Sequence, residues 1–184
     1  MLISKFGHGT LSKLKKFEKK YGIKFEDSYR AFLAKYNGGE TPNTIFKNGR
    51  KTETIKYLYG IEVEECLEKN MAYFDWKEKE CLPIGIDNFG NFYTIDISED
   101  NNGIIYFCDH ERGFSKSKIS DSFIEFIGKC KSSLIDEYAK KSPDEIEKDM
   151  IARGRESIIT DGLRDMWRQQ YEKYKDVIQE EVIL

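Results

Sequence analysis

Apolar residues recur at intervals of three and four in the first forty residues, a spacing that predicts two helices with one buried face each. The apolar stripe of the first helix is Leu14, Phe17 and Tyr21. Thr10 or Ser12 can cap its start, and Gly22 stands where helices commonly end. The stripe of the second helix is Tyr29, Phe32, Leu33 and Tyr36. Asn37-Gly38-Gly39 stops this helix, so we expect an αα-hairpin.

The centre of the chain carries strand patterns. Residues 81–87 predict a short apolar strand, and the next nine residues alternate between two faces with a period of two. A turn cluster at 98–103 and a further strand at 104–111 complete an antiparallel hairpin. The stretch 41–70 is mixed, with turn residues and one short strand. A helix follows the hairpin, and its predicted buried side is Phe123, Ile124, Phe126 and Ile127.

The last part of the chain has no strand signal. Ser142-Pro143-Asp144-Glu145 is a strong helix start, with a serine cap, a proline in the first turn and a glutamate at the capping-box position. After Gly154, a last helix presents an amphipathic face of Ile159, Leu163, Met166, Trp167, Gln170, Tyr174 and Val177. We therefore expect a domain over residues 1–130 and a helical C-terminal extension over residues 131–184, which packs on the domain or forms a homodimer.

The overall charge argues against binding to nucleic acid. The 184 residues include 30 basic and 33 acidic side chains, for a net charge of −3, whereas a broad basic face needs the opposite balance. No stretch approaches the roughly 20 apolar residues that span a bilayer, and the residues MLISKFGHGT contain no apolar run of signal-peptide length. We expect a cytoplasmic protein with no membrane contact and with reduced cysteines.

No catalytic constellation can be assembled from the sequence. His8 lies in an N-terminal stretch that we expect to be mobile. Cys108 and His110 share one face of a strand, but zinc needs three or four ligands. The glycines around residue 88 lack the spacing and the lysine of a phosphate-binding loop. The cysteines sit among apolar residues and are expected to be buried. We expect a protein that is not an enzyme, with no metal and no cofactor.

Acidic side chains cluster in the centre of the chain. Solvated turns are the ordinary explanation, an acidic docking face for a basic partner is the functional one, and a glycosidase-type carboxylate pair ranks lowest. Partner contacts commonly lie on loops that a rigid scaffold holds. The candidate partner-binding residues on this exposed acidic edge are Asp87, Asn88, Asn91, Asp96, Glu99, Asp100, Asp109 and Glu111. Trp76 and Trp167 are the two large anchors. Trp167 is expected in a core or in helix–helix packing, with a partner-binding role as the alternative.

Several short motifs occur in a characteristic order between Leu11 and Gly128. They are Phe17-Glu18, Tyr29…Phe32-Leu33…Tyr36-Asn37-Gly38-Gly39, Pro83-Ile84-Gly85, Gly90-Asn91…Asp96, Ile105-Tyr106 and the helix of Phe123-Ile124-Phe126-Ile127. In this order they resemble the SUKH superfamily, which includes bacterial immunity proteins and the Smi/Knr-like fungal cell-wall regulators. The chain departs from the family at Phe25-Glu26, where Leu-Pro is frequent, and at Asn91, where aspartate is frequent. The second departure puts a partner-contacting role for this position in doubt.

The resemblance implies an α+β fold with a mostly antiparallel sheet flanked by helices. It also implies binding rather than catalysis: such proteins are similar to antitoxins that block a secreted polymorphic toxin, often a nuclease. The expected partner is therefore a cognate toxin domain. A regulatory or scaffold module of the Smi/Knr type is the alternative. The extension after Lys131 lies outside the resemblance.

Overall fold

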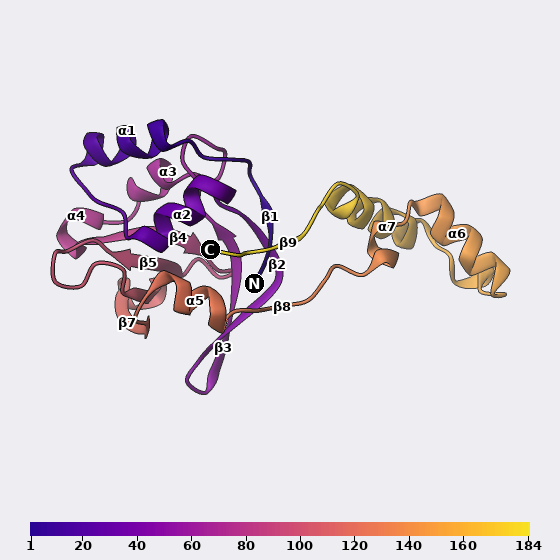
Figure 1. Ribbon diagram of the computed structural model, residues 1–184. Coiled ribbons are helices and arrows are strands. Elements are labelled where there is room, and N and C mark those ends of the chain that lie inside the picture. Colours follow the sequence, from indigo (N-terminus) through magenta and orange to yellow (C-terminus); the bar gives the residue numbers. More distant parts are fainter. The chain divides into compact units, whose positions relative to one another are not determined.

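A computed structural model describes all 184 residues, and it has the predicted α+β architecture, a large antiparallel sheet flanked by helices (Figure 1). The α-helices are α1 (Leu11–Tyr21), α2 (Asp27–Tyr36), α3 (Leu67–Met71), α4 (Trp76–Lys79), α5 (Phe123–Lys129), α6 (Pro143–Ala152) and α7 (Asp161–Tyr174). The strands are β1 (Leu2–Lys5), β2 (Gly39–Asn48), β3 (Lys51–Leu58), β4 (Cys81–Ile86), β5 (Phe92–Asp96), β6 (Ile105–Asp109), β7 (Ser115–Ser120), β8 (Lys131–Ser132) and β9 (Glu180–Glu181). Three short 3-10 helices are η1 (His110–Arg112), η2 (Glu137–Lys140) and η3 (Glu156–Ile158).

The chain forms two compact units. Residues 1–133 and 179–184 make up the sheet domain, and residues 134–178 make up the helical unit. The sequence pattern places the division at residue 130 and assigns the whole tail to the extension, whereas the last six residues lie in the sheet domain. They return there because β9 pairs with β1, and the Val182 amide donates to the Met1 carbonyl at 2.9 Å. The helical unit is therefore an insertion between β8 and β9.

The sheet has the strand order β7-β6-β5-β4-β3-β2-β1-β9, and β8 pairs with β2. All of these pairs are antiparallel. The predicted hairpin is confirmed as β5 and β6, with Tyr93 opposite Phe107. A register shift between Glu40 and Thr44 lets β2 pair with β1 at its start and with β8 further on.

Several strands of the sheet were not predicted, among them β7, which pairs with β6 in a stretch where no strand was expected. The mixed stretch after Gly39 contains the β2–β3 hairpin, whose pattern is obscured by its polar residues and by the irregularity at Pro42-Asn43. The N-terminal stretch expected to be mobile contains β1, with Ile3 fully buried. Strands of two residues, β8 and β9, follow Lys131, where no strand signal exists. Such short segments owe their conformation to pairing with a neighbouring strand rather than to their own pattern.

The αα-hairpin forms as expected. Thr10 caps α1, and Gly22 ends it in the left-handed conformation at φ 67°. Asn37, at φ 47°, ends α2. Its buried side-chain amide also exchanges two hydrogen bonds with the backbone of Ile61, at 2.9 and 3.1 Å, and so fixes the end of α2 to the segment that follows β3.

Aromatic side chains pack on both faces of the sheet at β5. Tyr93 contacts Phe126 of α5, with ring centroids 5.4 Å apart. The neighbouring Phe92 contacts Phe74 and Phe114 at 5.6 and 5.4 Å. Because successive strand residues point to opposite faces, these contacts cover both sides of the strand. All five β5 residues are consequently buried, although their alternating sequence is typical of a strand with one exposed face.

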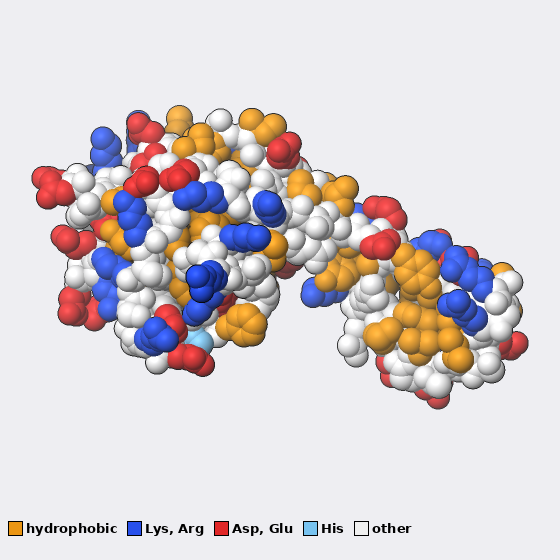
Figure 2. Space-filling view, turned by 90° about the horizontal axis from the view of Figure 1, so that it is seen from below, with side chains coloured by type: hydrophobic (Ala, Val, Ile, Leu, Met, Phe, Trp, Pro, Cys, Tyr) orange, Lys and Arg blue, Asp and Glu red, His pale blue; other side chains and the backbone are white.

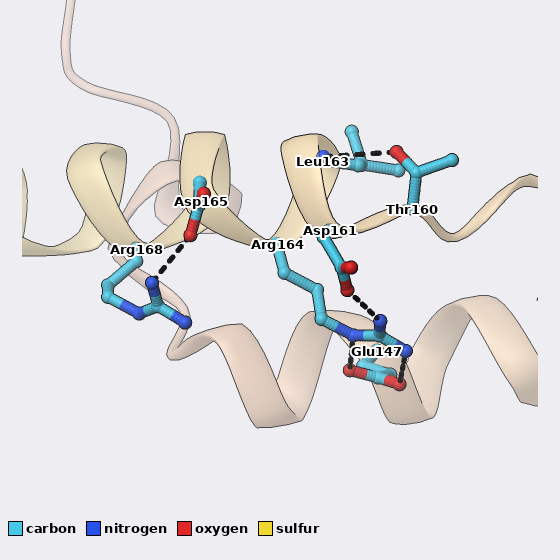
Figure 3. A network of polar contacts seen from close by, with 7 residues as sticks. All are labelled: Glu147, Thr160, Asp161, Leu163, Arg164, Asp165 and Arg168. Carbon is cyan, nitrogen blue, oxygen red and sulfur yellow. Dashed lines mark hydrogen bonds and ion pairs between the residues drawn. The ribbon is translucent and has the colours of Figure 1, made fainter.

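The helical unit is held together by polar contacts at its helix starts and between its helices. The predicted capping box of Ser142 and Glu145 is present at α6. Arg164 of α7 makes a two-pronged ion pair with Glu147 of α6, at 2.9 and 3.0 Å, and also contacts Asp161 (Figure 3). Trp167 is 5% exposed, which confirms its expected place in a core.

The apolar core of the helical unit is small. Its buried hydrophobic residues are Ile135, Ala139, Ile146 and Trp167. Larger apolar side chains of the unit remain exposed, namely Leu134, Tyr138, Ile151, Ile158, Met166 and Ile178. Apolar side chains gather on the face of this unit seen in Figure 2. A unit of this size rarely obtains much stability from its own core. Exposed apolar surface of this kind commonly marks an interaction site.

Candidate partner-binding site

The turn between β4 and β5 is organised by one buried carboxylate. Asp87 is 2% exposed, and its Oδ1 accepts hydrogen bonds from the backbone amides of Phe89 at 2.7 Å and of Asn91 at 2.9 Å. Its Oδ2 accepts from the side-chain amide of Asn91 at 2.7 Å. Buried carboxylates need such donors, because an ionised group without them is costly to bury. Asp87 therefore shapes the turn from within and does not lie on its surface.

Asn91 connects this turn to the end of β6. Its side-chain oxygen accepts hydrogen bonds from the backbone amide of His110 at 3.0 Å and from Nδ1 of the same residue at 2.8 Å. Asp87, Asn91 and His110 thus form a continuous polar chain across two strand ends. This chain joins two segments that lie about twenty positions apart in the sequence.

The same turn presents an exposed aromatic ring. Phe89 is 70% exposed, although its backbone amide is bonded to Asp87. The neighbouring Asn88 is exposed and donates to the Thr54 hydroxyl of β3 at 3.0 Å. The hydrogen bonds of the turn order the backbone that carries this ring, so binding need not order the backbone, which is favourable for a contact residue.

Two of the predicted acidic residues, Asp109 and Glu111, lie in the neighbouring segment: Asp109 caps η1, and Glu111 is within it. Asp109 accepts from the Glu111 amide at 3.0 Å and lies 3.5 Å from Arg112 Nε. Glu111 is exposed and makes no ion pair. We define the turn surface as Asn88, Phe89, Asp109, His110 and Glu111. It combines one aromatic ring with polar and charged groups at the ends of β4 and β6.

The remaining predicted residues lie at the other end of β5. Asp96 is 4% exposed, and its Oδ1 accepts from the Ser98 hydroxyl at 2.6 Å and the Ser98 amide at 2.9 Å. Glu99 and Asp100 follow in the β5–β6 turn and are exposed. A strand of five residues separates the two groups by roughly 15 Å, because each residue advances the strand by about 3.4 Å.

The expected single, exposed acidic edge is therefore wrong in two respects. Asp87 and Asp96 are buried because turn amides and hydroxyls use their oxygens, and the other residues divide between opposite ends of the strands. Phe89 and His110 were not among the predicted partner-binding residues. An aromatic residue placed between Asn88 and Gly90 in a turn is the signal that could have found the first, because turn tips are ordinarily polar.

The four cysteines are free and buried, as expected, and burial raises the pKa of Cys81 to about 11 and that of Cys130 to about 12. A nucleophilic cysteine typically has a lowered pKa, whereas burial raises the pKa of these two thiols. Cys108 and His110 have no further metal-ligating neighbours, because no group of three or more such side chains comes together in the chain. None of the helices is long and apolar enough to cross a membrane.

Comparison with known families supports the fold and the expected resemblance. A sequence comparison with curated proteins gave no match. The match to the SMI1/KNR4 family (SUKH-1) extends over residues 9–129, which includes α1 to α5, β2 to β7 and the whole turn surface. The helical unit lies outside this match. Because the match covers more than half of the chain, the protein belongs to the SMI1/KNR4 family (SUKH-1).

Proposed function

We propose that this protein is an immunity protein that binds a cognate secreted toxin and neutralises it without catalysis, and that the toxin is a nuclease. Membership of the SUKH-1 family is the observation that carries this proposal. Burial, which raises the pKa of Cys81, Cys108 and Cys130, is compatible with a structural rather than a catalytic role for these thiols. A net charge of −3 suits a partner that is itself basic, as proteins that act on nucleic acid commonly are.

We propose the turn surface as a contact region for the toxin. Its aromatic ring can enter a pocket on the partner, and Asp109, His110 and Glu111 surround it with polar groups. Interfaces typically have such an arrangement, with an aromatic anchor at the centre and a polar rim around it. The bonds that Asp87 and Asn91 make would hold the anchor in place before the partner arrives.

Co-expression tests both parts of the proposal. The chain is produced together with the toxin domain encoded nearest to it, cell survival is measured, and the complex is recovered by pull-down. Rescue with a stable complex supports the immunity function, whereas folded protein that neither rescues nor binds the toxin refutes it. Phe89→Ala should then reduce rescue, since truncation of a central aromatic anchor can cost about 2 kcal/mol or more of binding.

Tyr73→Ala is the matched control for Phe89→Ala. Tyr73 is also an exposed aromatic residue of the sheet domain, at 81%, but it lies between α3 and α4, outside the turn surface. The Tyr73→Ala variant should rescue the cells as well as the wild type does. Equal losses for the two variants would remove the turn surface from the proposal and would leave the immunity function to be judged by the wild-type result alone.

The exposed apolar residues of the helical unit favour a second candidate function, a regulatory or scaffold module that acts through this unit, including as a homodimer. Truncation is a poor test because it would also remove β9 from the sheet. The double variant Ile158→Glu/Met166→Glu keeps the chain length and places charges on two exposed apolar positions. A lower sedimentation coefficient for the variant than for the wild type would support the module. If both proteins sediment as monomers, self-association through these positions is excluded.

A further inference from the structure

A cleft of about 970 Å³ opens on the sheet domain at the end of α1, away from the turn surface. Three parts of the chain line it: the α1–α2 connection, the segment around α4, and the β5–β6 turn. Its lining includes Glu99, one of the predicted partner-binding residues. Glu99 therefore lies in a concave site, unlike the turn surface between β4 and β5.

The floor of the cleft is aromatic and apolar. The rings of Tyr21 and Trp76 meet edge to face, with centroids 5.9 Å apart, and Phe25 and Ile97 continue the apolar lining. Tyr21 and Trp76 are only half-buried, and a lysine Nζ already lies over each ring, that of Lys20 at 4.8 Å from the Tyr21 centroid and that of Lys77 at 5.6 Å from the Trp76 centroid. A half-buried tryptophan is a preferred contact for a cation, because the ring carries negative charge density on its faces.

Backbone contacts hold the walls of the cleft in place. The Asn102 side chain donates to the Lys24 carbonyl at 3.3 Å and connects the β5–β6 turn to the α1–α2 connection. The Ile97 amide donates to the Glu80 carbonyl at 2.9 Å and connects the same turn to the end of α4. Gly103 lies so close to Glu26 that a Cβ there would be 2.8 Å from its Cγ. The cleft is therefore preformed and does not require a partner to assemble it.

Carboxylates outnumber cations around the cleft. The acidic lining residues are Glu26, Asp27, Glu80 and Glu99, and the basic ones are Lys24 and Lys77. Glu26 is engaged as the cap of α2, where its Oε2 accepts from the Ser28 hydroxyl and the Tyr29 amide. The side chains of Asp27, Glu80 and Glu99 are exposed and have no hydrogen bond or ion pair within the protein. They supply three carboxylates without partners to a cleft whose floor holds two aromatic rings.

Lys77 already shows that the tryptophan accepts a cation. Its Nζ lies 5.6 Å from the Trp76 ring centroid, within the range of a cation–π contact. Lys77 is exposed and makes no ion pair, so little would hold it in place against a competing cation. An incoming cation with more donors could displace it and gain contacts with the free carboxylates.

We infer that this cleft binds an arginine side chain from a basic protein partner. The guanidinium is planar, stacks on aromatic rings and pairs with two carboxylates at once, whereas a lysine ammonium does so less effectively. Its aliphatic stem fits against the apolar floor. As a contact with the toxin, the inference rests on the proposed function, but the binding chemistry of the cleft can be tested without any toxin.

The probe is a short peptide, acetyl-Gly-Arg-Gly-Arg-Gly-amide, titrated into the ¹⁵N-labelled full chain. The two tryptophan indole N–H resonances act as reporters, and the spectrum of Trp76→Phe assigns them. The resonance of Trp76 and those of the cleft lining should shift and saturate, while the resonance of Trp167 should not move. Shifts confined to other parts of the chain, or equal shifts with the lysine or glutamine analogue of the peptide, would overturn the inference.

Charge variants separate the cleft from the general effect of net charge. Asp27→Asn/Glu80→Gln/Glu99→Gln should weaken binding of the arginine peptide by about tenfold, if each exposed ion pair contributes a small part. The matched control, Asp144→Asn/Glu156→Gln/Asp176→Asn, removes the same number of charges from the helical unit and should leave the affinity unchanged. Equal weakening by both variants would show that only net charge matters and would overturn the inference.

Lys77→Ala provides a test in the opposite direction. It removes the cation that now lies over Trp76, so the arginine peptide should bind more tightly than it binds to the wild type. Weaker binding by this variant would contradict the proposed displacement.

If the peptide results hold but co-expression gives no rescue, the cleft remains an arginine site and the immunity function fails. If rescue occurs without peptide binding, the function stands and this inference fails.

Discussion

The side-chain oxygen of Asn91 accepts two hydrogen bonds from His110, one from its backbone amide at 3.0 Å and one from Nδ1 at 2.8 Å. Nδ1 of His110 therefore carries a hydrogen, because the oxygen of Asn91 can only accept. The Asn91 amide nitrogen donates in turn to Asp87. The exposed ring of Phe89 is consequently carried by a turn that is bonded both internally and to the neighbouring strand.

Asn91→Ala should lower the free energy of unfolding by about 1–3 kcal/mol, because it leaves the buried Asp87 carboxylate one donor short and releases His110. Urea unfolding at neutral pH measures the loss. Asn88→Ala is the control, since Asn88 is exposed and its bond to Thr54 lies at the surface. That variant should stay within about 0.5 kcal/mol of the wild type. Equal effects of the two substitutions would contradict the central position of Asn91.

Glu125 gives the sheet domain a defined dependence on pH. Hydrogen bonds from Lys129, from the Asp121 amide and from the Ser120 hydroxyl lower its pKa to about 2. A carboxyl whose pKa is lower in the folded state stabilises the fold above its unfolded pKa, and it loses this contribution as pH falls through the folded value. The stability advantage of the wild type over Glu125→Gln should therefore be largest near neutral pH and shrink between about pH 4.5 and pH 2.

Urea midpoints for both proteins, taken at intervals of pH, measure this difference. Glu111→Gln serves as a control because the Glu111 carboxylate is exposed and makes no hydrogen bond or ion pair. Its midpoint should follow that of the wild type at every pH. A gap between the wild type and Glu125→Gln that stays constant down to pH 3 would disagree with the lowered pKa.

Trp167→Ala should unfold the helical unit and leave the sheet domain folded. Trp167 is the largest of the few buried apolar side chains in this unit, and removal of a buried tryptophan typically costs about 3–5 kcal/mol. A small unit has little stability in reserve. Circular dichroism should show a loss of helix, and amide exchange should become fast only within residues 134–178. A single transition in which both units unfold together would contradict their independence.

The four cysteines should react slowly with thiol reagents in the native protein. They are all buried, and burial raises the pKa of Cys81, Cys108 and Cys130, so that little thiolate is present at neutral pH. Labelling with a chromogenic disulfide at pH 8 should be slow without denaturant and should reach four thiols per chain in urea. Fast labelling of one thiol in the native state would identify a reactive cysteine that the fold does not predict.

Helix caps, helix ends and the central hairpin were predictable because each depends on residues that are close together in the chain. The cap at Thr10, the stop at Gly22 and the capping box of Ser142 all depend on residues within a few positions, and they occur as expected. The β5–β6 hairpin was predictable because its turn cluster and alternation are contiguous. The β2–β3 hairpin was not, since its polar residues become strand only through pairing with neighbouring strands.

The candidate site was predictable only as a region. The concentration of Asp, Asn and Glu in the centre of the chain located the turns, but it did not distinguish carboxylates that bond to their own turn from those that face solvent. Asp87 and Asp96 are of the first kind, whereas Glu99 and Glu111 are of the second. The difference depends on which backbone amides converge on each side chain, and this is fixed by the strand ends rather than by composition.

The sequence by itself determined the α+β class, the positions of the main helices, the central hairpin and the family, because each of these depends on local spacing and on the order of motifs. Only the tertiary structure placed β1 and β9 side by side, which made the helical unit an insertion, and joined Asn91 to His110 and Trp76 to Tyr21. These relationships connect residues that are far apart in the chain. They form when strands pair and faces pack, and no periodicity within a single segment specifies them.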